Sequence, residues 1–320
     1  MRANSQPRCS SADMPTEPQL SFAIPFYGSV EYLHKAIASI RNQTLRDWTL
    51  VIVDDCSPSQ GARALVESLG DTRITYFRNE RNLGLADNWN RCVELCHTPL
   101  VTLLHSDDEL YPRYAEMMLA AHRQWPDAAA VFCRALIVNE QSKPVFSLRD
   151  RVKRWLMPAA DQAFVLVGEE GTRRLLRGNF VICPSLCYKR SAFDGLRFST
   201  RWRFMLDLDF LVRVLLAGKQ LVGLPDFAIR YRRHAEQVTV ECERNLKMFT
   251  EEIDFLRWAA EEARTRGWMR ARSVAQKMPI IKLQILHYAL QDFMHFQFAA
   301  ARMKLKLLGQ GMGIKAQPPA

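Results

Sequence analysis

The four segments that decide the fold follow one another as LSFAIPFYG (20–28), LVIVDDCS (50–57), NLGLADNWN (82–90) and LLHSDDELYP (103–112). The first, second and fourth contain the short apolar runs that are typical of buried strands. Between the first two, Leu33, Ile37 and Ile40 repeat at helical spacing after Ser29, a residue type that caps helices. This alternation of strands and helices predicts an α/β fold built on a Rossmann-like, mostly parallel sheet.

The same patterns, followed outward, predict the other elements. Strands are expected at 20–25, 50–55, 74–79, 100–110, 128–138, 184–190 and 220–234, the last as one strand or two. Helices are expected after Ser29, from Pro112 onward, and at 57–70, 85–96, 207–217, 248–264 and 279–308. The last helix is expected to place these apolar residues on roughly one face: Ile281, Ile285, Leu286, Ala289, Phe293 and Phe296. The stretch 139–168 shows neither period and is too long for an ordinary connection, which indicates a functional or mobile loop.

The charge is unevenly distributed along the 320 residues. Lys and Arg number 44 against 34 Asp and Glu, a net charge of +10. Residues 264–320 hold ten of the basic residues and one acid, Asp292, so this end carries +9 and the rest of the chain +1. A nearly neutral body with a basic end indicates a localised contact with an anionic partner.

Several classes of protein are excluded by pattern. The first 19 residues contain no apolar stretch and read as a disordered leader rather than a secretory signal. No run of 18 apolar residues occurs, so no membrane-spanning helix is expected. The eight cysteines lack the matched spacing of a zinc site and are expected to be reduced and structural. The protein is therefore expected to be cytoplasmic, or peripheral at the inner face of the cytoplasmic membrane.

Acids stand in pairs where two of the expected strands end, at Asp54-Asp55 and at Asp107-Asp108. Ligands of parallel sheets bind outside the carboxyl ends of the strands. Paired carboxylates there are costly without a cation, and the usual one is Mg²⁺ or Mn²⁺ bridging to a phosphate. The alternative is that these acids only cap the following helices. Two pairs on neighbouring strand ends favour a nucleotide and metal site.

The blocks IPFYG, VDDCS, NLGLADNWN and LLHSDDELYP, with LDLDFLVRVLLAG (206–218) and AIRYRRHAEQVT (228–239) further on, resemble the family 2 glycosyltransferases. The resemblance covers about residues 20–239. It implies an inverting enzyme of the GT-A fold, similar to bacterial enzymes that build surface polysaccharides. It also implies three parts: a leader at 1–18, a transferase domain at 19–238 and a basic helical extension at 239–320. The donor half of the domain is expected at about 19–138 and the acceptor half at about 169–238.

The resemblance also implies which residues bind the nucleotide-sugar donor. Tyr27 is expected to stack on the base, with Pro25 shaping the strand exit. Asp55 is expected to accept the N3–H of a pyrimidine, which favours a UDP- or dTDP-linked donor. Asn82 lies in the loop that approaches the donor.

The segment HSDD stands where the family has its Asp-x-Asp motif. Asp107 corresponds to the residue that binds the divalent cation, Mg²⁺ or Mn²⁺, which neutralises the leaving diphosphate. His105 replaces the first Asp of the motif and is expected to hydrogen-bond ribose or sugar as a neutral imidazole. His234 corresponds to a histidine that reaches the metal or the diphosphate, and the adjoining Arg232 and Arg233 favour an anionic contact.

The base that deprotonates the acceptor hydroxyl is expected to be Asp207, which matches the Asp of the family's Glu-Asp pair. Leu206 replaces the Glu and is expected to desolvate Asp207, which would raise its pKa. The alternative is that Asp207 caps the helix, with Asp209 as the second candidate base. Trp202 and Arg203 are candidates for the wall of the acceptor pocket.

Other functions remain alternatives at this stage. A nucleotidyltransferase would need a Gly-rich, basic loop after the first strand, which PFYGSVEY does not provide. A degenerate transferase acting as a scaffold is suggested by His105 and Leu206. In the basic C-terminal region, Lys and Arg residues flank an apolar helix rich in Phe and Met, which favours an anionic membrane surface over nucleic acid as the partner. The alternative is that this region packs on itself as a helical hairpin or forms a dimer contact. The acceptor is expected to be a glycan or a polyprenyl-linked glycan, and the sequence specifies neither the sugar nor the oligomeric state.

Overall fold

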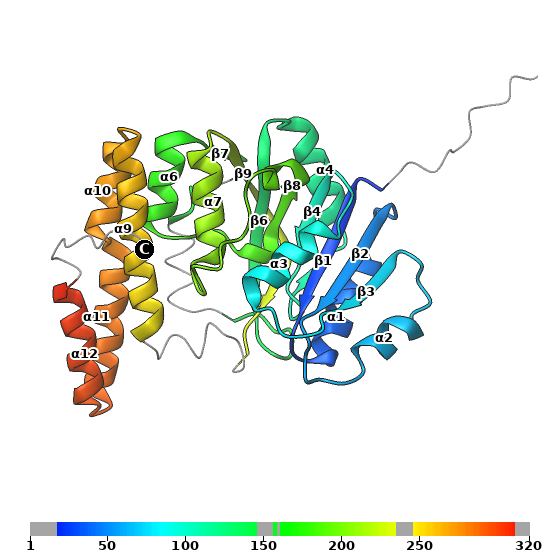
Figure 1. Ribbon diagram of the computed structural model, residues 1–320, viewed down its shortest axis with the longest axis horizontal. Coiled ribbons are helices and arrows are strands. Elements are labelled where there is room, and N and C mark those ends of the chain that lie inside the picture. Colours follow the sequence, from blue (N-terminus) through cyan, green and yellow to red (C-terminus); the bar gives the residue numbers. More distant parts are fainter. Residues whose placement is uncertain (1–17, 146–155, 159–160, 235–245, 311–320) are drawn as a thin grey trace, which may run out of the picture.

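The computed structural model describes residues 18–145, 156–158, 161–234 and 246–310 (Figure 1). A nine-stranded sheet runs through the body, and helices cover both of its faces. Apart from residue 18, the expected leader lies outside the described residues. The expected domain boundary at residue 238 also lies outside them.

The strands are β1 (Leu20–Phe26), β2 (Trp48–Asp54), β3 (Ile74–Arg78), β4 (Leu100–Leu103), β5 (Glu109–Leu110), β6 (Ala128–Val138), β7 (Phe164–Leu166), β8 (Leu186–Lys189) and β9 (Gln220–Arg232). Their order is β3-β2-β1-β4-β8-β6-β9-β5, and β7 pairs with β9. The pairs among β3, β2, β1 and β4 are parallel. β8 is antiparallel to both β4 and β6, so β6 runs in the same direction as β4, and β9 is parallel to β6. The carboxyl ends of β1, β2, β3, β4 and β9 therefore meet at one edge.

The helices are α1 (Val30–Arg41), α2 (Ala62–Ser68), α3 (Leu85–Glu94), α4 (Tyr114–Gln124), α6 (Gly168–Arg177), α7 (Leu206–Leu216), α9 (Leu246–Thr265), α10 (Met269–Lys277), α11 (Pro279–Met294) and α12 (Phe298–Gln310). Among the described residues, none of these helices combines the length and hydropathy needed to cross a bilayer.

The period-two pattern of the strands divides the core between the two faces of the sheet. In β2, Leu50 and Ile52 join the cluster formed with α1 and α4, whereas Val51 and Val53 join the cluster formed with α3, α6 and α7. Apolar side chains on both faces explain why β2 reads as one continuous apolar run.

The stretch 139–168, of which 146–155 and 159–160 lie outside the described residues, contains the short strand β7 where no strand was expected. The structure also corrects four further expectations about the elements. The stretch 100–110 forms two strands, β4 and β5, separated by the acidic turn. α4 begins at Tyr114 rather than at Pro112. α6 lies where no helix was expected, because half of its residues are charged and only two of its buried residues, Leu175 and Leu176, are large and apolar.

The fourth correction concerns 279–308, which is two helices rather than one. Phe296 has a φ of +58°, and the N–H of Gln297 donates to the carbonyl oxygen of Asp292, which is the Schellman type of helix end. Gly or Asn usually occupies the left-handed position, so the sequence did not mark this turn. Leu286, Phe293 and Phe296 are exposed instead of sharing the buried face.

Glutamates tie the C-terminal helices to the body. Glu251 of α9 accepts the backbone N–H groups of Phe204 and Met205 with one carboxylate oxygen, at 2.6 and 2.9 Å, just before α7 begins. Glu169 of α6 does the same for Arg270 and Ala271 at the start of α10. The helices α9 and α10 thus belong to the same packed core as α6 and α7.

Glu251→Ala is expected to lower the free energy of unfolding by about 1 kcal/mol, because it removes the acceptor for two N–H groups at a helix start. Urea denaturation monitored by circular dichroism measures the loss. Glu261→Ala, on the same helix but in an exposed pair with Arg264, is the matched control and should leave stability nearly unchanged. Equal effects of the two substitutions would contradict the capping role.

Candidate active site at the carboxyl edge of the sheet

The two acids at the end of β2 have different environments. Asp54 is fully buried and accepts from Ser57 N–H (2.7 Å), the Tyr76 hydroxyl (2.5 Å) and Arg78 Nη1 (2.6 Å). Both of its oxygens are occupied by groups that hold the strand end in place. Asp54 therefore has a local structural role, although it does not cap the following helix, because the N-cap of α2 is Gly61 and has no side-chain cap.

Asp55 holds the loop that follows β3. Its Oδ1 accepts from Asn79 Nδ2 at 2.7 Å and from Leu83 N–H at 2.8 Å, and its Oδ2 accepts from Gly84 N–H at 2.9 Å. The side chain is only 3% exposed. A carboxylate has about four lone-pair sites, so three donors leave room for one further donor. Asp55 thus shapes the loop, and its expected contact to a pyrimidine stays a prediction.

The other residues expected at the donor lie around this edge. Tyr27 follows β1 directly and is 56% exposed, so its ring is free to receive a flat ligand. Pro25 is half-buried and is the residue before the last one of β1. Asn82 is exposed, and its Oδ1 accepts from Gly84 N–H at 3.0 Å, so it orders the loop that Asp55 holds.

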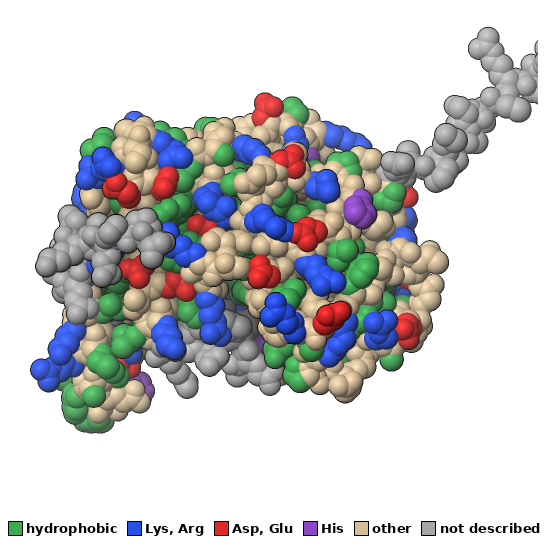
Figure 2. Space-filling view, in the orientation of Figure 1, with side chains coloured by type: hydrophobic (Ala, Val, Ile, Leu, Met, Phe, Trp, Pro, Cys, Tyr) green, Lys and Arg blue, Asp and Glu red, His purple; other side chains and the backbone are tan. Residues whose placement is uncertain are grey.

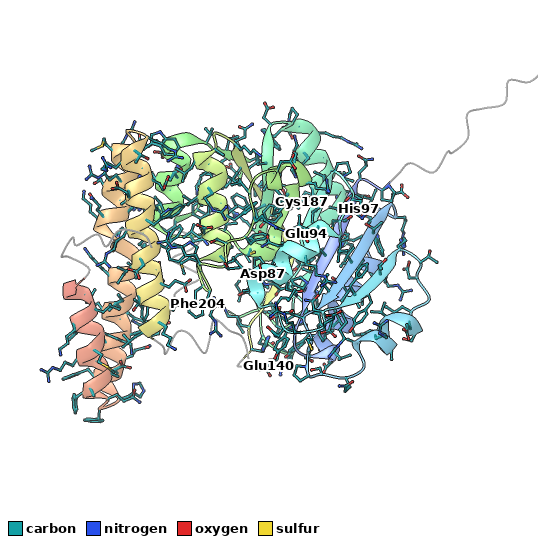
Figure 3. All side chains as sticks on the ribbon, in the orientation of Figure 1. Asp87, Glu94, His97, Glu140, Cys187 and Phe204 are labelled. Carbon is teal, nitrogen blue, oxygen red and sulfur yellow. The ribbon has the colours of Figure 1, made fainter. Side chains whose placement is uncertain are left out.

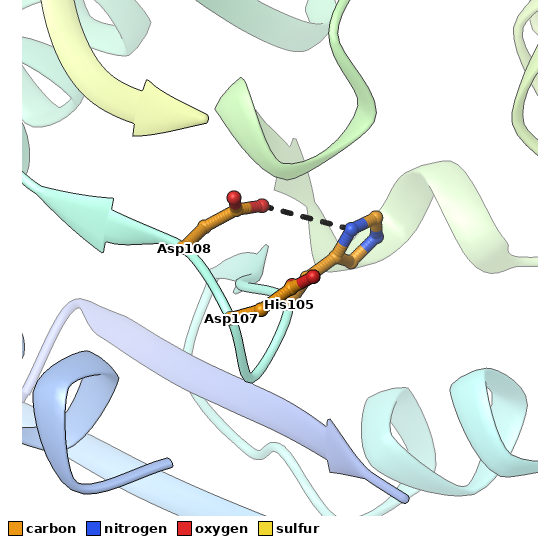
Figure 4. Close-up of side chains that lie close together, drawn as sticks. All are labelled: His105, Asp107 and Asp108. Atoms are coloured by element: carbon orange, nitrogen blue, oxygen red, sulfur yellow. Dashed lines mark ion pairs between the residues drawn. The ribbon is translucent and has the colours of Figure 1, made fainter. Parts of the chain in front are cut away.

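The acidic turn after β4 brings His105, Asp107 and Asp108 together, with one possible ligand atom from each lying within 4.8 Å of the others (Figure 4). His105 Nδ1 lies 3.7 Å from Asp108 Oδ2. Burial lowers the pKa of His105, and the nearby Asp107 and Asp207 carboxylates oppose this shift. Burial raises the pKa of Asp108 well above its usual value, and the Asp107 charge adds to the rise. The imidazole is therefore neutral near pH 7.

The donor set of this turn suits a hard divalent cation. Asp108 Oδ2 and His105 Nε2 are buried and have no hydrogen-bond partner within the described part of the chain. Carboxylate oxygens are the preferred ligands of Mg²⁺ and Mn²⁺, and imidazole is acceptable to Mn²⁺. The residues present thus fit the cation that was expected at this position, although His105 supplies nitrogen where the family supplies oxygen.

His234 lies beside the turn, as expected for a residue at the end of β9. Its Nε2 is 3.0 Å from Asp107 Oδ2, and its ring packs against Tyr32 with centroids 5.0 Å apart. Its Nδ1 is buried without a partner among the residues described. Asp107 and His234 therefore share one side of the site.

Arg232 has a structural role that the sequence did not indicate. It is fully buried, and its Nε donates to the Asp107 carbonyl oxygen at 2.9 Å. Its Nη atoms donate to the carbonyl oxygens of Asn139 and Glu140 and to the carboxylate of Glu109. Instead of offering a free anionic contact, Arg232 clamps the acidic turn to the loop after β6.

The two candidate bases of α7 are clearly separated by their contacts. Asp209 is 2% exposed, and its oxygens accept from Trp202 Nε1 (3.0 Å) and Arg213 Nε (2.8 Å). Asp207, in the first turn of α7, is only half-buried and accepts from Asn179 Nδ2 at 3.4 Å and from Leu208 N–H at 2.8 Å. Asp207 is also close enough to His105 to influence its pKa. Asp209 is thus committed to packing, and Asp207 faces the site.

The expected acceptor-pocket residues differ. Trp202 is 6% exposed and packs its ring edge against Phe255, so it belongs to the core rather than to an open pocket. Arg203 is exposed over the ring of Phe204, which Figure 3 labels between α7 and α9. A polar cavity of about 770 Å³ lies elsewhere, along α3 from Leu83 and Asp87 to Glu94 and against residues 195–200.

Sequence reasoning missed the residues that support the site. Asn79 bridges Asp55 and Asn88, and Asn88 Nδ2 donates to the Val53 carbonyl oxygen at 3.2 Å. The available signal was the position of Asn79 directly after β3, at the same edge as the acids. No local pattern marked Tyr32 or Glu251, because their partners lie far away in the chain.

Comparison with known proteins agrees with this geometry. A family model described as Glycosyl transferase family 2 matches residues 21–194, which is more than half of the chain. The succinoglycan biosynthesis protein ExoO of Rhizobium meliloti is 23% identical over 306 residues, 91% of this chain and 85% of ExoO.

Two solved structures share the fold at low identity. S. aureus TarS 1–349 in complex with UDP has a TM-score of 0.56 and 16% identity, and the match covers 92% of this chain and 90% of TarS. The mannosyltransferase PcManGT from Pyrobaculum calidifontis, in complex with GDP-Man and Mn²⁺, has a TM-score of 0.58 and 14% identity, covering 93% and 81% of the two chains. These likenesses confirm the expected fold class, a GT-A-like α/β sheet with a helical C-terminal region.

Proposed function

The chain belongs to glycosyl transferase family 2 and is a glycosyltransferase, and from this premise we propose the reaction that its site performs. It moves a sugar from a UDP- or dTDP-linked donor to a hydroxyl of a glycan or lipid-linked acceptor, with inversion at the anomeric carbon. The observation that carries the proposal is the meeting of the acidic turn, His234 and Asp207 at the edge where the parallel strands end.

The donor nucleotide lies across the ends of β1 and β2. Tyr27 stacks on the base, Pro25 fixes the direction of the chain before it, and Asp55 accepts the pyrimidine N3–H with its remaining lone pair. Asn82 keeps its loop close to the donor. His105 is a neutral hydrogen-bonding group toward ribose or sugar, which agrees with the direction of its pKa shift.

A divalent cation, Mg²⁺ or Mn²⁺, would be held by Asp107 and His234, with Asp108 Oδ2 in reach of the same space. When bound, it supplies positive charge that stabilises the departing diphosphate. The Mn²⁺ in the PcManGT complex supports this choice of cation class.

Asp207 acts as the general base. Its carboxylate accepts the proton of the acceptor hydroxyl while that oxygen attacks the anomeric carbon from the face opposite the leaving diphosphate. Asn179 orients the carboxylate through Oδ2. The neighbouring Leu206 is buried, which limits the access of water from one side.

The printed names of relatives support the proposed acceptor class and cellular setting. ExoO is named for succinoglycan biosynthesis, which supports a role for this chain in surface polysaccharide synthesis. We therefore place its work in the cytoplasm, at the inner face of the cytoplasmic membrane, where a polyprenyl-linked glycan would present the acceptor hydroxyl. A non-catalytic scaffold and a nucleotidyltransferase are the alternatives that the experiments below separate from this proposal.

Thermal unfolding with a panel of nucleotides tests the donor assignment. UDP or dTDP with Mn²⁺ is expected to raise Tm, since a ligand at a hundredfold excess over Kd stabilises by about 2.7 kcal/mol. GDP and ADP are the controls and are expected to give smaller shifts. A larger shift with GDP would refute the pyrimidine assignment, and the absence of any nucleotide effect would favour the scaffold. A nucleotidyltransferase would release pyrophosphate from a nucleoside triphosphate and a sugar phosphate.

A further inference from the structure

The α11–α12 hairpin exposes the largest group of apolar side chains in the described residues. Nine of its large apolar side chains are 50% to 79% exposed. They are Leu283, Leu286, Leu290, Phe293, Met294, Phe296, Phe298, Met303 and Leu305. In Figure 2 green side chains gather at the lower left of the molecule, over the hairpin, with blue side chains nearby. Monomeric soluble proteins rarely expose contiguous apolar surface of this kind without a binding role.

This exposed face is separate from the face that packs against the body. Ile281, Ile285 and Ala289 repeat every four residues on α11 and are buried. Leu283, Leu286 and Leu290 follow at spacings of three and four on the other side of the same helix. Helix α11 is therefore apolar on two sides, and packing within the described residues accounts for only one of them.

The charges around the hairpin suit an anionic partner. Residues 279–308 contain four Lys or Arg residues and one acid, Asp292, a net charge of +3. Asp292 pairs with Lys304, which is buried between the helices. The other basic side chains, Lys282, Arg302 and Lys306, flank the apolar stripes of their helices. A second copy of the same face would bring like charges together, whereas anionic headgroups would neutralise them.

The position of the hairpin agrees with such a partner. In Figure 1 the connection between α11 and α12 lies at the lower side of the view, and β1 runs downward to its carboxyl end. Glu140, whose carbonyl oxygen accepts from Arg232 of the site, is labelled at the lower edge of Figure 3. A membrane surface that touches the connection between α11 and α12 would therefore lie on the same side of the molecule as the opening of the site.

We propose that the α11–α12 hairpin docks this enzyme on an anionic phospholipid bilayer. Phe293, Met294, Phe296 and Phe298, at the end of the hairpin, enter the interface between headgroups and acyl chains. Lys282, Arg302 and Lys306 contact the headgroup phosphates. The inference goes beyond the sugar transfer proposed above, because it assigns a surface and a partner that do not depend on the donor or the base.

Co-sedimentation of the full chain with vesicles tests the proposal. Binding is expected to vesicles of phosphatidylcholine mixed with phosphatidylglycerol, and much less to phosphatidylcholine alone. Phe293→Ser combined with Phe296→Ser is expected to weaken binding about tenfold or more. Lys282→Glu with Arg302→Glu is expected to remove the preference for phosphatidylglycerol. Val165→Ser with Phe227→Ser, two exposed apolar residues on β7 and β9, is the matched control and should bind like the wild type.

Two outcomes would overturn the proposal. One is unchanged vesicle binding by the Phe293/Phe296 variant while its circular dichroism spectrum and Tm match those of the wild type. The other is a dimer of the wild type, measured by light scattering, that is absent in this variant, while neither protein binds vesicles. The apolar face would then be a contact between two copies of the chain. Donor-induced thermal shifts of the same variants report on the proposed transferase separately, so failure of one proposal is distinguishable from failure of the other.

Discussion

Asp207→Asn is expected to lower kcat by about 10²–10⁴-fold, the usual contribution of a positioned general base. The amide keeps the size of the side chain, and its single oxygen can still accept the Leu208 N–H. Only the long 3.4 Å contact with Asn179 is lost, so the fold should be unaffected. Because Asp207 is placed on the acceptor side, donor-induced thermal stabilisation should be retained. Initial rates of nucleoside diphosphate release with donor and acceptor measure kcat, and the Tm shift measures donor binding.

Asp209→Asn provides the contrasting control two residues away. Asp209 is buried between Trp202 Nε1 and Arg213, so removing its charge leaves the guanidinium without its carboxylate. We expect a lower Tm for this variant and, below its Tm, a kcat within about tenfold of wild type. A variant at 207 that retains full activity, or a loss of activity at 209 without loss of stability, would contradict the assignment of the base.

The first half of the fold could be predicted from the sequence because its signals are local. The apolar runs that begin at Leu20, Leu50 and Ile74 place three strands, and the helical spacing from Leu33 places α1 between the first two. The helix expected at 57–70 is shorter, because α2 spans Ala62–Ser68. Later elements were harder to predict. A strand was expected at 184–190, where β8 lies, but its antiparallel insertion between β4 and β6 is a long-range pairing that no local pattern shows. α6 was missed because only two of its four buried residues, Leu175 and Leu176, are large and apolar.

The sequence predicted where the candidate site lies, but it did not predict which residues hold the site residues in place. Acids at strand ends indicated where charge gathers, but nothing in VDDCS distinguishes Asp54, which is saturated by Tyr76 and Arg78, from Asp55. That distinction depends on partners 22 to 29 residues away. Arg232 was misjudged for the same reason, because its ligands come from loops about 90 and 125 residues earlier.

The charge of the C-terminal region has two components in the structure. In α9 and directly after it, Arg264 and Arg266 pair with Glu261 and Glu262, and Arg270 of α10 pairs with Glu169 of α6. In the α11–α12 hairpin the single acid is already paired with Lys304, so three cations remain. Our proposal assigns the anionic contact indicated for residues 264–320 to this hairpin, where the cations lie beside exposed apolar side chains.

Asp107→Asn is expected to reduce kcat by about 10²–10³-fold and to abolish the dependence of donor binding on Mn²⁺. Asp107 is the partly exposed carboxylate of the acidic turn, and its Oδ2 lies 3.0 Å from His234 Nε2. The amide removes one negative charge from the side of the site shared with His234. Treatment of the wild type with EDTA should give the same loss, and added Mn²⁺ should restore activity to the wild type only.

Asp108→Asn is the control that distinguishes cation binding by Asp107 from a general effect of changing an acid in the turn. Burial raises the pKa of Asp108, and its Oδ1 accepts from the Arg232 N–H at 2.8 Å, an interaction that an amide oxygen can preserve. Because burial disfavours the charge of this carboxyl, an uncharged amide of nearly the same shape should fit in its place, and the Tm of the variant without metal should be near that of the wild type. If Asp108→Asn removed the Mn²⁺ dependence while Asp107→Asn kept it, the main ligand would be Asp108, and the position matched to the family motif would be wrong by one residue.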